Sequence, residues 1–508
     1  MGHAELRQGA ADADDGDRAW GVAIEIPERS NRGGVRQIMS PERKASSRKS
    51  KPDIAATGAA GLLAERELRA IIENVLRLAN SSEADETEVH VDEVDDSLTR
   101  FANNAIHQNV AERGLTVSVR TVVDGRTARA TTNRVDEDSL RGAIEASLSL
   151  AHSQPKDPRL LPMPGKQKYR KVNRFSVPTA ALTPEDRARA VKRACDLAIA
   201  HGQVAAGIFA SGLSQTAMGN SRGLFAAYRE THAEFSITMQ ASPAASWAKA
   251  NSGNVRDFNP LSLAETASDK AHRALNAQEL APGKYTVILE PSAVLDLVGF
   301  LFYDFSATAL ADKRSCLNDR MGKAIFGKNI SVTDDAYHPL QLGAPFDGEG
   351  MSREKVALVS GGVPKNLVYS RASAKVAKKK PTGHGFALPN EYGEAPMNLV
   401  FGGGSDSIER MIASTERGLL VTRLWYIREV DPYEKIMTGM TRDGLFLVEK
   451  GKVTSAVKNF RFNQSLLDML KNVEMMGPAV RATGEEAFEM VVPAMKVRDF
   501  HFSEVTKF

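Results

Sequence analysis

Cysteine is nearly absent from the sequence: only Cys195 and Cys316 occur in 508 residues, and they do not form a Cys-x-x-Cys pair. Two cysteines are too few for a disulfide framework or for a zinc site built on thiolates. Histidine is also sparse, because ten are scattered along the chain and no two stand four or five residues apart. This spacing excludes a helix that holds a metal ion with a pair of histidines.

Long apolar runs and a strong net charge are lacking as well. No uninterrupted apolar stretch approaches the roughly 18 residues of a membrane span, and the N-terminus has no apolar core of a signal peptide. The formal net charge of +3 is small for this length, so no global field indicates nucleic acid or an anionic membrane as a partner. We therefore expect a cytoplasmic protein with no membrane segment and no nucleic-acid partner.

Residues 1–57 differ in composition from the rest of the chain. They are rich in Gly, Ala, Asp, Arg and Ser, show little apolar periodicity, and contain a basic cluster just before Pro52. Such a composition cannot bury enough apolar surface to offset the entropy of folding. We predict a disordered N-terminal extension, with a nucleic-acid-binding arm as the alternative interpretation.

Helical and strand patterns alternate in the next two segments, residues 58–154 and 155–280, which are predicted as an N-terminal and a central α+β domain. Five prolines between residues 155 and 178 form the connection. The predicted helices are 62–80, 138–152, 184–201 and 261–275. The predicted strands are 86–93, 116–123, 127–132, 203–211 and 224–239. Strands separated by turn-forming residues favour antiparallel sheets flanked by helices.

Residues 281–508 are predicted as a β-rich C-terminal domain, because short strand-like runs alternate there with turns rich in Gly, Asp and Pro. A hydrophobic content of 42% over 508 residues is enough for a sizeable core and favours at least two domains. The prediction for the whole chain is an α+β fold. N-terminal antiparallel sheet and helix blocks are followed by a mainly β C-terminal domain with one buried helix.

That buried helix is expected over residues 289–312, after a strand at 285–289. Pro291 suits the first helical position, and Glu290 places negative charge near the helix N-terminus. An apolar stripe at helical spacing should pack on a core; it comprises Leu295, Val298, Phe302, Phe305 and Ala309. A second, more polar stripe is expected to face a cavity; it comprises Asp296, Gly299, Tyr303 and Ser306.

Six short motifs follow one another in an order that resembles a known family. They are Thr-Arg-Phe-Ala-Asn-Asn (99–104), Asn-Ser-Arg-Gly-Leu (220–224), Thr-Asp-Asp (333–335), Pro-Phe-Asp-Gly-Glu-Gly (345–350), Pro-Thr-Gly-His-Gly (381–385) and Ala-Ser-Thr-Glu-Arg-Gly-Leu-Leu-Val-Thr-Arg-Leu-Trp (413–425). The last is the most specific. Taken together, over residues 60–505, they resemble the TldD/PmbA or modulator-of-DNA-gyrase family.

The resemblance implies proteolysis of flexible peptides and unfolded segments in the cytosol by paired subunits, one of which carries zinc. In the zinc subunit, His-Glu-x-x-x-His supplies ligands and a general base. Counted from Pro291, this motif should fall on residues 299–304, where the sequence reads Gly-Phe-Leu-Phe-Tyr-Asp. Gly299, Phe300 and Asp304 therefore mark a degenerate position. The resemblance implies a TldE/PmbA-type subunit that binds no metal or other cofactor itself and supports a zinc-bearing TldD-type paralogue.

Three residues are predicted to bind peptide: Tyr303, from the polar stripe, and Thr422 and Arg423, from the last motif. The latter two should lie on opposite faces of a strand, so that one lines the cavity. For Arg423, an ion pair with a neighbouring carboxylate is the alternative. Gly418 is expected to supply a permissive backbone where the helix 407–414 ends.

Other interpretations stay open. The chain could be a stand-alone homodimer that binds extended peptide, or a peptidase with an unrecognised site. A patchwork metal site is a further alternative; its candidate ligands are Asp304, Asp334, Asp335, Asp347, Glu349 and His384. These acidic residues are also explained as turn residues whose side chains accept hydrogen bonds from local backbone N–H groups.

Overall fold

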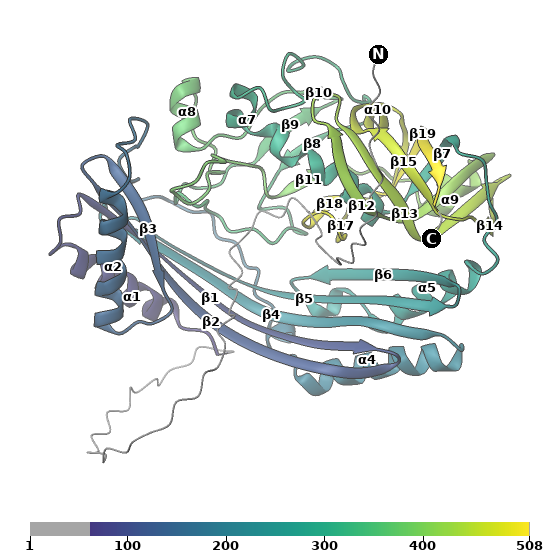
Figure 1. The fold of residues 1–508 in the computed structure, drawn as a ribbon, viewed down its shortest axis with the longest axis horizontal. Helices are drawn as coiled ribbons and strands as arrows, with labels where there is room; N and C mark the ends of the chain where they lie inside the picture. Colours follow the sequence, from purple (N-terminus) through teal and green to yellow (C-terminus); the bar gives the residue numbers. More distant parts are fainter. Residues whose placement is uncertain (1–60, 507–508) are drawn as a thin grey trace, which may run out of the picture. The chain divides into compact units, whose positions relative to one another are not determined.

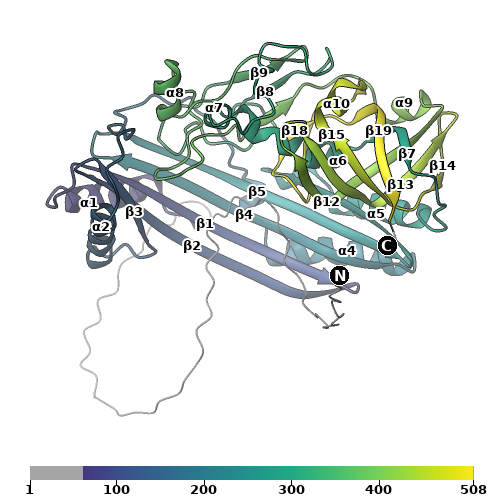
Figure 2. The same ribbon diagram turned by 45° about the horizontal axis from the view of Figure 1, so that its top comes forward.

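A six-stranded antiparallel sheet organises the first half of the computed structural model, which describes residues 61–506 (Figure 1). The predicted extension, residues 1–57, lies outside the described residues. The strand order is β3-β2-β1-β4-β5-β6. The strands are β1 (Glu86–Ala102), β2 (Ala105–Val123), β3 (Arg126–Thr132), β4 (Val204–Asn220), β5 (Phe225–Ala241) and β6 (Ala244–Ser252). Figure 2 shows β2, β1, β4 and β5 running side by side.

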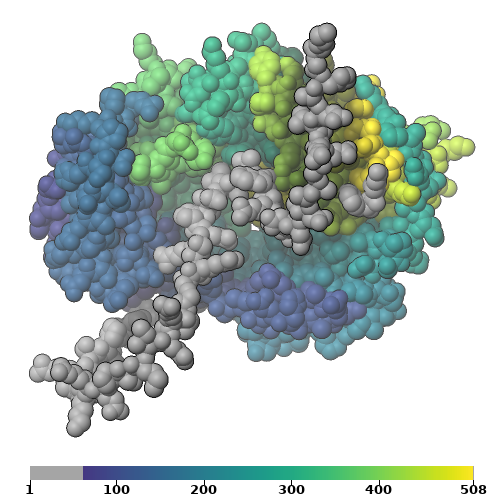
Figure 3. Space-filling view, in the orientation of Figure 1, coloured from purple at the N-terminus to yellow at the C-terminus, as the bar shows by residue number. Residues whose placement is uncertain are grey.

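Strands β1 and β2 form a hairpin that is much longer than the predicted strands 86–93 and 116–123. A turn at Asn103 and Asn104 closes it, and both residues have positive φ, 50° and 60°. Two consecutive residues with positive φ are typical of the type I′ turn, whose twist matches that of the paired strands. The pairing therefore continues through the residues between the two predicted strands. Figure 3 shows this hairpin at the surface of the molecule.

Strand β1 also pairs with β4 along its length, from Glu88 opposite Asn220 to Phe101 opposite Gly207. The segments 58–154 and 155–280 thus contribute strands to a single sheet. Their sequences gave no indication of this pairing, because the two strands are separated by about a hundred residues, well beyond local patterning.

Four helices cover one face of the sheet and confirm the four predicted helices. They are α1 (Glu65–Ala79), α2 (Glu137–His152), α4 (Pro184–Ala200) and α5 (Pro260–Arg273). Helices α1 and α2 pack on one cluster that includes Ala217, and α4 and α5 pack on another that includes Ala205 and Phe209. These three residues of β4 are an even number of positions apart, so both clusters lie on the same face. The short α3 (Val177–Ala180) and η1 (Val255–Asp257) flank this region.

The C-terminal half contains a ring of strands, because β12 pairs with both β7 and β13 and the order β12-β7-β19-β15-β13 closes on itself. The ring strands are β7 (Gly283–Leu289), β12 (Arg417–Asp431), β13 (Ile436–Glu449), β15 (Phe460–Ser465) and β19 (Met495–Val505). Two further strands pair with members of the ring: β14 (Lys452–Ala456) with β13, and β16 (Val473–Met476) with β19. Closure leaves the ring with few free edges.

A second, smaller sheet has the order β10-β9-β8-β11-β18-β17. Its strands are β8 (Val332–Asp334), β9 (Val356–Ser360), β10 (Val363–Pro364), β11 (Leu399–Phe401), β17 (Val480–Ala482) and β18 (Met490–Val492). Three short helices lie between these strands: α8 (Arg371–Ala377) between β10 and β11, α9 (Ile408–Ala413) between β11 and β12, and α10 (Leu466–Lys471) between β15 and β16. The mixed α+β class with a mainly β C-terminal half is as predicted. In the described part of the chain, no helix is both long and apolar enough to cross a membrane.

The stretch 289–312 forms three pieces instead of one continuous helix. These are α6 (Pro291–Val298), the 3₁₀ helix η2 (Gly299–Phe305) and α7 (Ala307–Ala311). Pro291 stands at the start of α6 as predicted. Ser306 adopts an extended backbone and caps α7 by accepting a hydrogen bond from the backbone N–H of Ala309, which ends the preceding 3₁₀ turn. Periodicity alone could not reveal this break, because Ser306 also fits the polar stripe.

Candidate functional site

The degenerate motif lies on η2, which directly follows α6. Gly299 is buried, and the space that a Cβ atom would need there is already taken by the Cβ of Ala487. A larger residue at position 299 would therefore clash unless residue 487 moved away. The position expected to carry a metal ligand in a zinc-bearing relative is filled by packed protein.

Residues 483–488 provide this filling, and Asp296 on α6 holds them in place. The Oδ1 atom of Asp296 accepts hydrogen bonds from the backbone N–H groups of Glu485, at 3.1 Å, and Glu486, at 3.0 Å. The Ser292 hydroxyl donates to the carbonyl of Thr483 at 2.9 Å. We call residues 483–488 the covering segment, because they lie against both α6 and η2.

Aromatic packing adds to these hydrogen bonds. The ring of Phe488 packs edge-on against Phe302, with the ring centroids 5.4 Å apart. The predicted cavity beside the polar stripe is therefore wrong for Asp296, Gly299 and Ser306, which are all buried against protein. The reason is tertiary: the covering segment, almost two hundred residues away in sequence, packs on Asp296 and Gly299. Ser306 instead donates a hydrogen bond to the buried Glu394 at 2.8 Å.

Asp296 has an unusual electrostatic environment. Burial raises the pKa of its carboxyl to about 7, against the opposing effect of the two backbone hydrogen bonds. Its Oδ2 atom is buried and has no hydrogen-bond partner. Carboxyls with such raised pKa values occur at catalytic sites. Here the side chain is fully buried beneath the covering segment, so a substrate cannot reach it.

Asp304, the last residue of the degenerate motif, is also committed to protein contacts. Its Oδ2 atom lies 2.6 Å from the Nζ atom of the buried Lys435, and its Oδ1 accepts a hydrogen bond from the backbone N–H of Cys316 at 2.7 Å. Lys435 forms a second ion pair with Glu429. Burial raises the pKa of the Cys316 thiol, which keeps it protonated.

These residues do not fit a zinc ion. Gly299 has no side chain and Phe300 is apolar, while the carboxylate of Asp304 is neutralised by an ammonium group. Zinc sites in proteins are built from imidazole, thiolate and carboxylate donors that converge on one point. In residues 61–506 no group of three or more His, Cys, Asp or Glu side chains could hold a metal ion.

The three residues predicted to bind peptide are placed apart. The Tyr303 hydroxyl donates to the carbonyl of Tyr392 at 2.9 Å, and its side chain is half-buried. Thr422 is buried and accepts a hydrogen bond from Lys270 at 3.2 Å. The structure does not join Tyr303 to the other two by any described contact.

Arg423 is buried between two tryptophans. Its guanidinium carbon lies 4.7 Å from the ring centre of Trp247 on β6 and 5.5 Å from that of Trp425. It forms an ion pair with Asp443 and lies 3.8 Å from Glu485 of the covering segment. Arg423 thus links strand β12 to the N-terminal sheet and to the covering segment. This is the geometry of the ion-pair alternative stated for this residue.

Gly418 does not end a helix, and this prediction is wrong. Helix α9 stops at Ala413, and Gly418 lies inside strand β12. A Cβ atom on Gly418 would come 2.6 Å from the carbonyl oxygen of Thr286 on the parallel neighbour β7. The position requires glycine because of this close approach between backbones, and not because of a left-handed conformation.

The proposed patchwork ligands form separate local contacts. His384 pairs with Asp334 at 2.9 Å, and Asp347 accepts a hydrogen bond from the backbone N–H of Gly385 at 2.7 Å. Glu349 accepts one from the backbone N–H of Arg371 at 2.8 Å. The remaining two candidates pair with lysines, Asp335 with Lys355 and Asp304 with Lys435. Most of these carboxylates therefore stabilise irregular backbone.

Sequence patterns did not reveal the covering segment or the buried Glu394, whose contacts hold the starts of α7 and α8 together. Only weak signals mark them, since Gly484-Glu485-Glu486 reads as an ordinary exposed turn. The side chain of Glu394 accepts hydrogen bonds from Ser306, Thr308, Ser370 and Ser373. Serines and threonines at helix starts were the available hint, but they do not identify the carboxylate that they bind.

Comparison with known proteins gives a consistent result along the chain. Models of PmbA/TldA metallopeptidase domains match three parts: domain 1 at residues 88–151, the central domain at 178–275 and the C-terminal domain at 282–504. The metalloprotease PmbA homolog of Haemophilus influenzae is 25% identical over 431 residues, covering 80% of this chain and 91% of that protein.

Two further proteins are similar. An uncharacterised protein of Methanocaldococcus jannaschii is 25% identical over 274 residues, covering 53% of this chain. That match spans 63% of the archaeal protein, less than two thirds of its length. The crystal structure of TldE from Thermococcus kodakarensis superposes with a TM-score of 0.77 at 20% identity, covering 85% of this chain and 100% of that chain. At this identity the superposition shows a common fold.

Proposed function

Since this chain belongs to the PmbA/TldD metallopeptidase family, we propose that it is a subunit of a paired protease that lacks a zinc centre of its own. One observation carries the proposal. At the position of the degenerate motif, Gly299 is covered by Ala487, and Asp304 is neutralised by Lys435. A metal-binding helix needs space and free donors at that place, and both are taken here.

In this proposal the chain completes a dimer with a zinc-bearing relative and forms part of the wall around the peptide. The covering segment keeps the degenerate position closed, so the peptide is cut only at the partner's zinc centre. The buried ion pair of Asp304 with Lys435 also keeps this position closed. If the ammonium group moved away, the buried carboxylate would be left without a compensating charge, which is strongly destabilising.

The first experiment compares the chain alone with the assembled pair. The purified full chain is dialysed against a chelator and its zinc is measured by elemental analysis, with cleavage of an unfolded fluorescent peptide as the activity readout. We expect no stoichiometric zinc and no cleavage by the chain alone. Adding a relative that carries His-Glu-x-x-x-His should give cleavage above that of the relative alone.

A matched control variant and the size of the particle complete this experiment. The control is the same relative with the motif glutamate replaced by glutamine, which should assemble but not cleave. Light scattering at micromolar concentration should show a particle larger than 55.1 kDa. One tightly held zinc per chain after dialysis, or cleavage by this chain alone, would overturn the proposal.

A second candidate function, a stand-alone peptide-binding protein, is favoured by one exposed sheet edge. Strand β3 pairs only with residues 117–123 of β2, so in the described chain residues 105–116 have β1 on one side and no strand on the other. Residues 105–113 are exposed. An extended peptide could add there as a further strand through main-chain hydrogen bonds. Saturable peptide binding by the chain alone, without cleavage, would support this candidate.

Contacts of Tyr303, Thr422 and Arg423 with peptide remain part of the proposal, and Arg423 gives the sharpest test. Arg423→Ala should be measured in the assembled pair for both cleavage and melting temperature, with Arg423→Lys as the control that keeps the charge. Lost cleavage at unchanged stability supports contact with peptide. A lower melting temperature with a proportionate loss of cleavage assigns Arg423 to holding β12 against the N-terminal sheet.

A further inference from the structure

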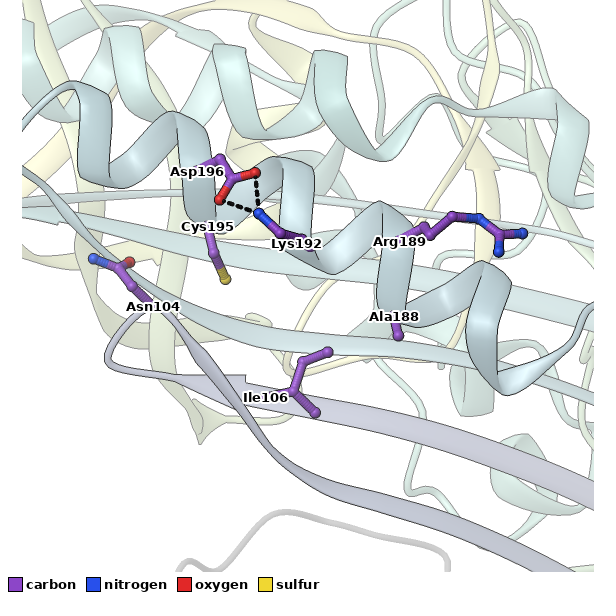
Figure 4. Close-up of a pocket in the computed structure, with 7 residues that line it drawn as sticks. All are labelled: Asn104, Ile106, Ala188, Arg189, Lys192, Cys195 and Asp196. Atoms are coloured by element: carbon purple, nitrogen blue, oxygen red, sulfur yellow. Dashed lines mark hydrogen bonds and ion pairs between the residues drawn. The ribbon is translucent and has the colours of Figure 1, made fainter.

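Two pockets beside the N-terminal sheet differ in how their charges are satisfied. The pocket in Figure 4 has a volume of about 420 Å³ and lies between α4 and the start of β2. Its two basic residues are paired with neighbouring acids on α4, Lys192 with Asp196 at 2.7 Å and Arg189 with Asp186. With its charges neutralised internally, this pocket offers no free group to a charged ligand.

The other pocket is larger and its charges are free. It has a volume of about 600 Å³ and lies between the start of α1, strands β4 and β5, and the extended segment 169–173. Three exposed basic residues line it: Arg170, Lys171 and Arg229. In the described chain, none of these three side chains forms an ion pair or a hydrogen bond. The acidic residue at this pocket, Glu65, is likewise unpaired there.

Aromatic rings hold both arginines in place while leaving their donors available. The guanidinium carbon of Arg229 lies 4.6 Å from the ring centre of Phe175, and that of Arg170 lies 4.5 Å from the ring centre of Tyr337. Stacking on a ring contacts the face of the guanidinium group, so the N–H groups in its plane stay free to bind an oxyanion. Reduced side-chain freedom also lowers the entropy lost on binding.

Arg174 provides a contrast within the same connecting segment. Its guanidinium donates to the carbonyl oxygens of Ala336, His338 and Pro339. Arg174 therefore attaches the segment to the C-terminal half. In the described chain, the guanidinium N–H groups of Arg170 and Arg229 donate no such hydrogen bonds. Tyr169 also lines the pocket, and its hydroxyl donates a hydrogen bond to the carbonyl of Gly350 at 2.7 Å, which fixes this part of the wall.

We propose that this pocket binds a small molecule with at least two oxyanionic groups, carboxylates or phosphates, held by Arg170, Lys171 and Arg229. Three cations face one carboxylate, and planar guanidinium groups match the geometry of carboxylate and phosphate oxygens. Glu65 at the helix start would accept a hydrogen bond from a hydroxyl or ammonium group of the same ligand. The site is separate from the degenerate motif and does not depend on the proposed role in proteolysis.

The test uses two probes that distinguish the two kinds of oxyanion. After dialysis against chelator, the full chain is titrated by calorimetry with citrate and with pyrophosphate at low ionic strength. We expect saturable binding of at least one probe, weakening as salt is added. Tighter citrate binding identifies a polycarboxylate ligand, and tighter pyrophosphate binding identifies a phosphorylated one.

Matched variants locate the binding. Lys171→Gln and Arg229→Gln should each weaken the probe about tenfold, because each removes one charged hydrogen-bond donor. Lys171 makes no ring contact, so its replacement leaves packing intact, and thermal unfolding checks the folding of both variants. Lys452→Gln is the control, since Lys452 is exposed on β14 and unpaired in the described chain. The absence of saturable binding for both probes, or equal weakening by Lys452→Gln, would overturn the proposal.

Discussion

The N-terminal sheet and the region between α7 and β11 differ in how they supply hydrogen-bond acceptors for their buried backbone N–H groups. In the sheet, strands of up to 19 residues satisfy each other's backbone hydrogen bonds along continuous ladders. Between α7 and β11, the longest strand has five residues. Buried backbone N–H groups must still find acceptors. There the acceptors include buried carboxylates.

Asp334, Asp347 and Glu394 illustrate this second solution. Asp347 accepts hydrogen bonds from the backbone N–H groups of Glu349, Met351 and Gly385. A carboxylate can accept several such bonds at once, which lets one side chain hold several turns together. We therefore expect the stability of the sheet to be distributed over many weak contacts, and that of the irregular region to be concentrated in a few residues.

Replacing Glu394 with alanine should have the largest effect. The variant leaves the buried backbone N–H groups of Thr308 and Ser370 and nearby hydroxyl groups without their acceptor. We expect a loss of about 3–5 kcal/mol in the free energy of unfolding, measured by chemical denaturation. The control is Glu391→Ala, at an exposed position three residues away. Equal effects of the two variants would contradict the concentration of stability in buried carboxylates.

Asp296→Asn should change the pH dependence of stability. The pKa of Asp296 is raised by burial to about 7 in the folded chain, compared with roughly 3.9 in an unfolded chain. Between these values the unfolded chain has lost the proton that the folded chain keeps, so wild-type stability falls as pH rises and levels off above pH 7. The variant lacks this titration, and its stability relative to wild type should rise by about 2–4 kcal/mol from pH 4 to pH 8.

The comparison with wild type isolates Asp296 from other groups. Burial also raises the pKa of Glu349 to about 7, but Glu349 titrates in both proteins and its contribution cancels in the difference. Denaturation curves at pH 4 and pH 8 provide the measurement, and the exposed Asp468→Asn serves as the control. If the difference in unfolding free energy between Asp296→Asn and wild type stayed constant with pH, folding would not raise the pKa of Asp296, and the prediction would be wrong.

Gly299→Val should test the contact between η2 and the covering segment. The added side chain competes with Ala487 for the same space, and overpacking of this kind costs about 1–3 kcal/mol. The double variant Gly299→Val with Ala487→Gly should recover part of the loss, as measured by denaturation. If the two substitutions were simply additive, the covering segment would not be packed on Gly299 in solution.

The smallest effect is expected in the hairpin turn of the sheet. Asn103→Ala places a less tolerant residue at φ 50° and should cost about 1 kcal/mol, whereas Asn103→Gly should be nearly neutral. The measurement is again the free energy of unfolding. A loss as large as that from Glu394→Ala would contradict the view that stability is distributed along the sheet.

The sequence was sufficient for elements whose signals are local. The predicted helix 184–201 begins at Pro184 as expected, and the structure adds the cap, in which the Thr183 side chain accepts a hydrogen bond from the backbone N–H of Asp186. Pro291 likewise predicted the start of α6. The motif order at residues 99–425 was sufficient to indicate the family. Apolar periodicity, caps and turn residues act within a few positions, so they can be read directly from the chain.

Only the tertiary structure decided what surrounds those elements. It joined β1 to β4, paired Ser306 with Glu394 where the stretch 289–312 breaks, and brought Ala487 over Gly299. It also gathered Arg170, Lys171 and Arg229 around one pocket. Each of these depends on residues distant in sequence, whose contact is set by packing and by the need to satisfy buried polar groups. Neither requirement leaves a periodic mark on the chain.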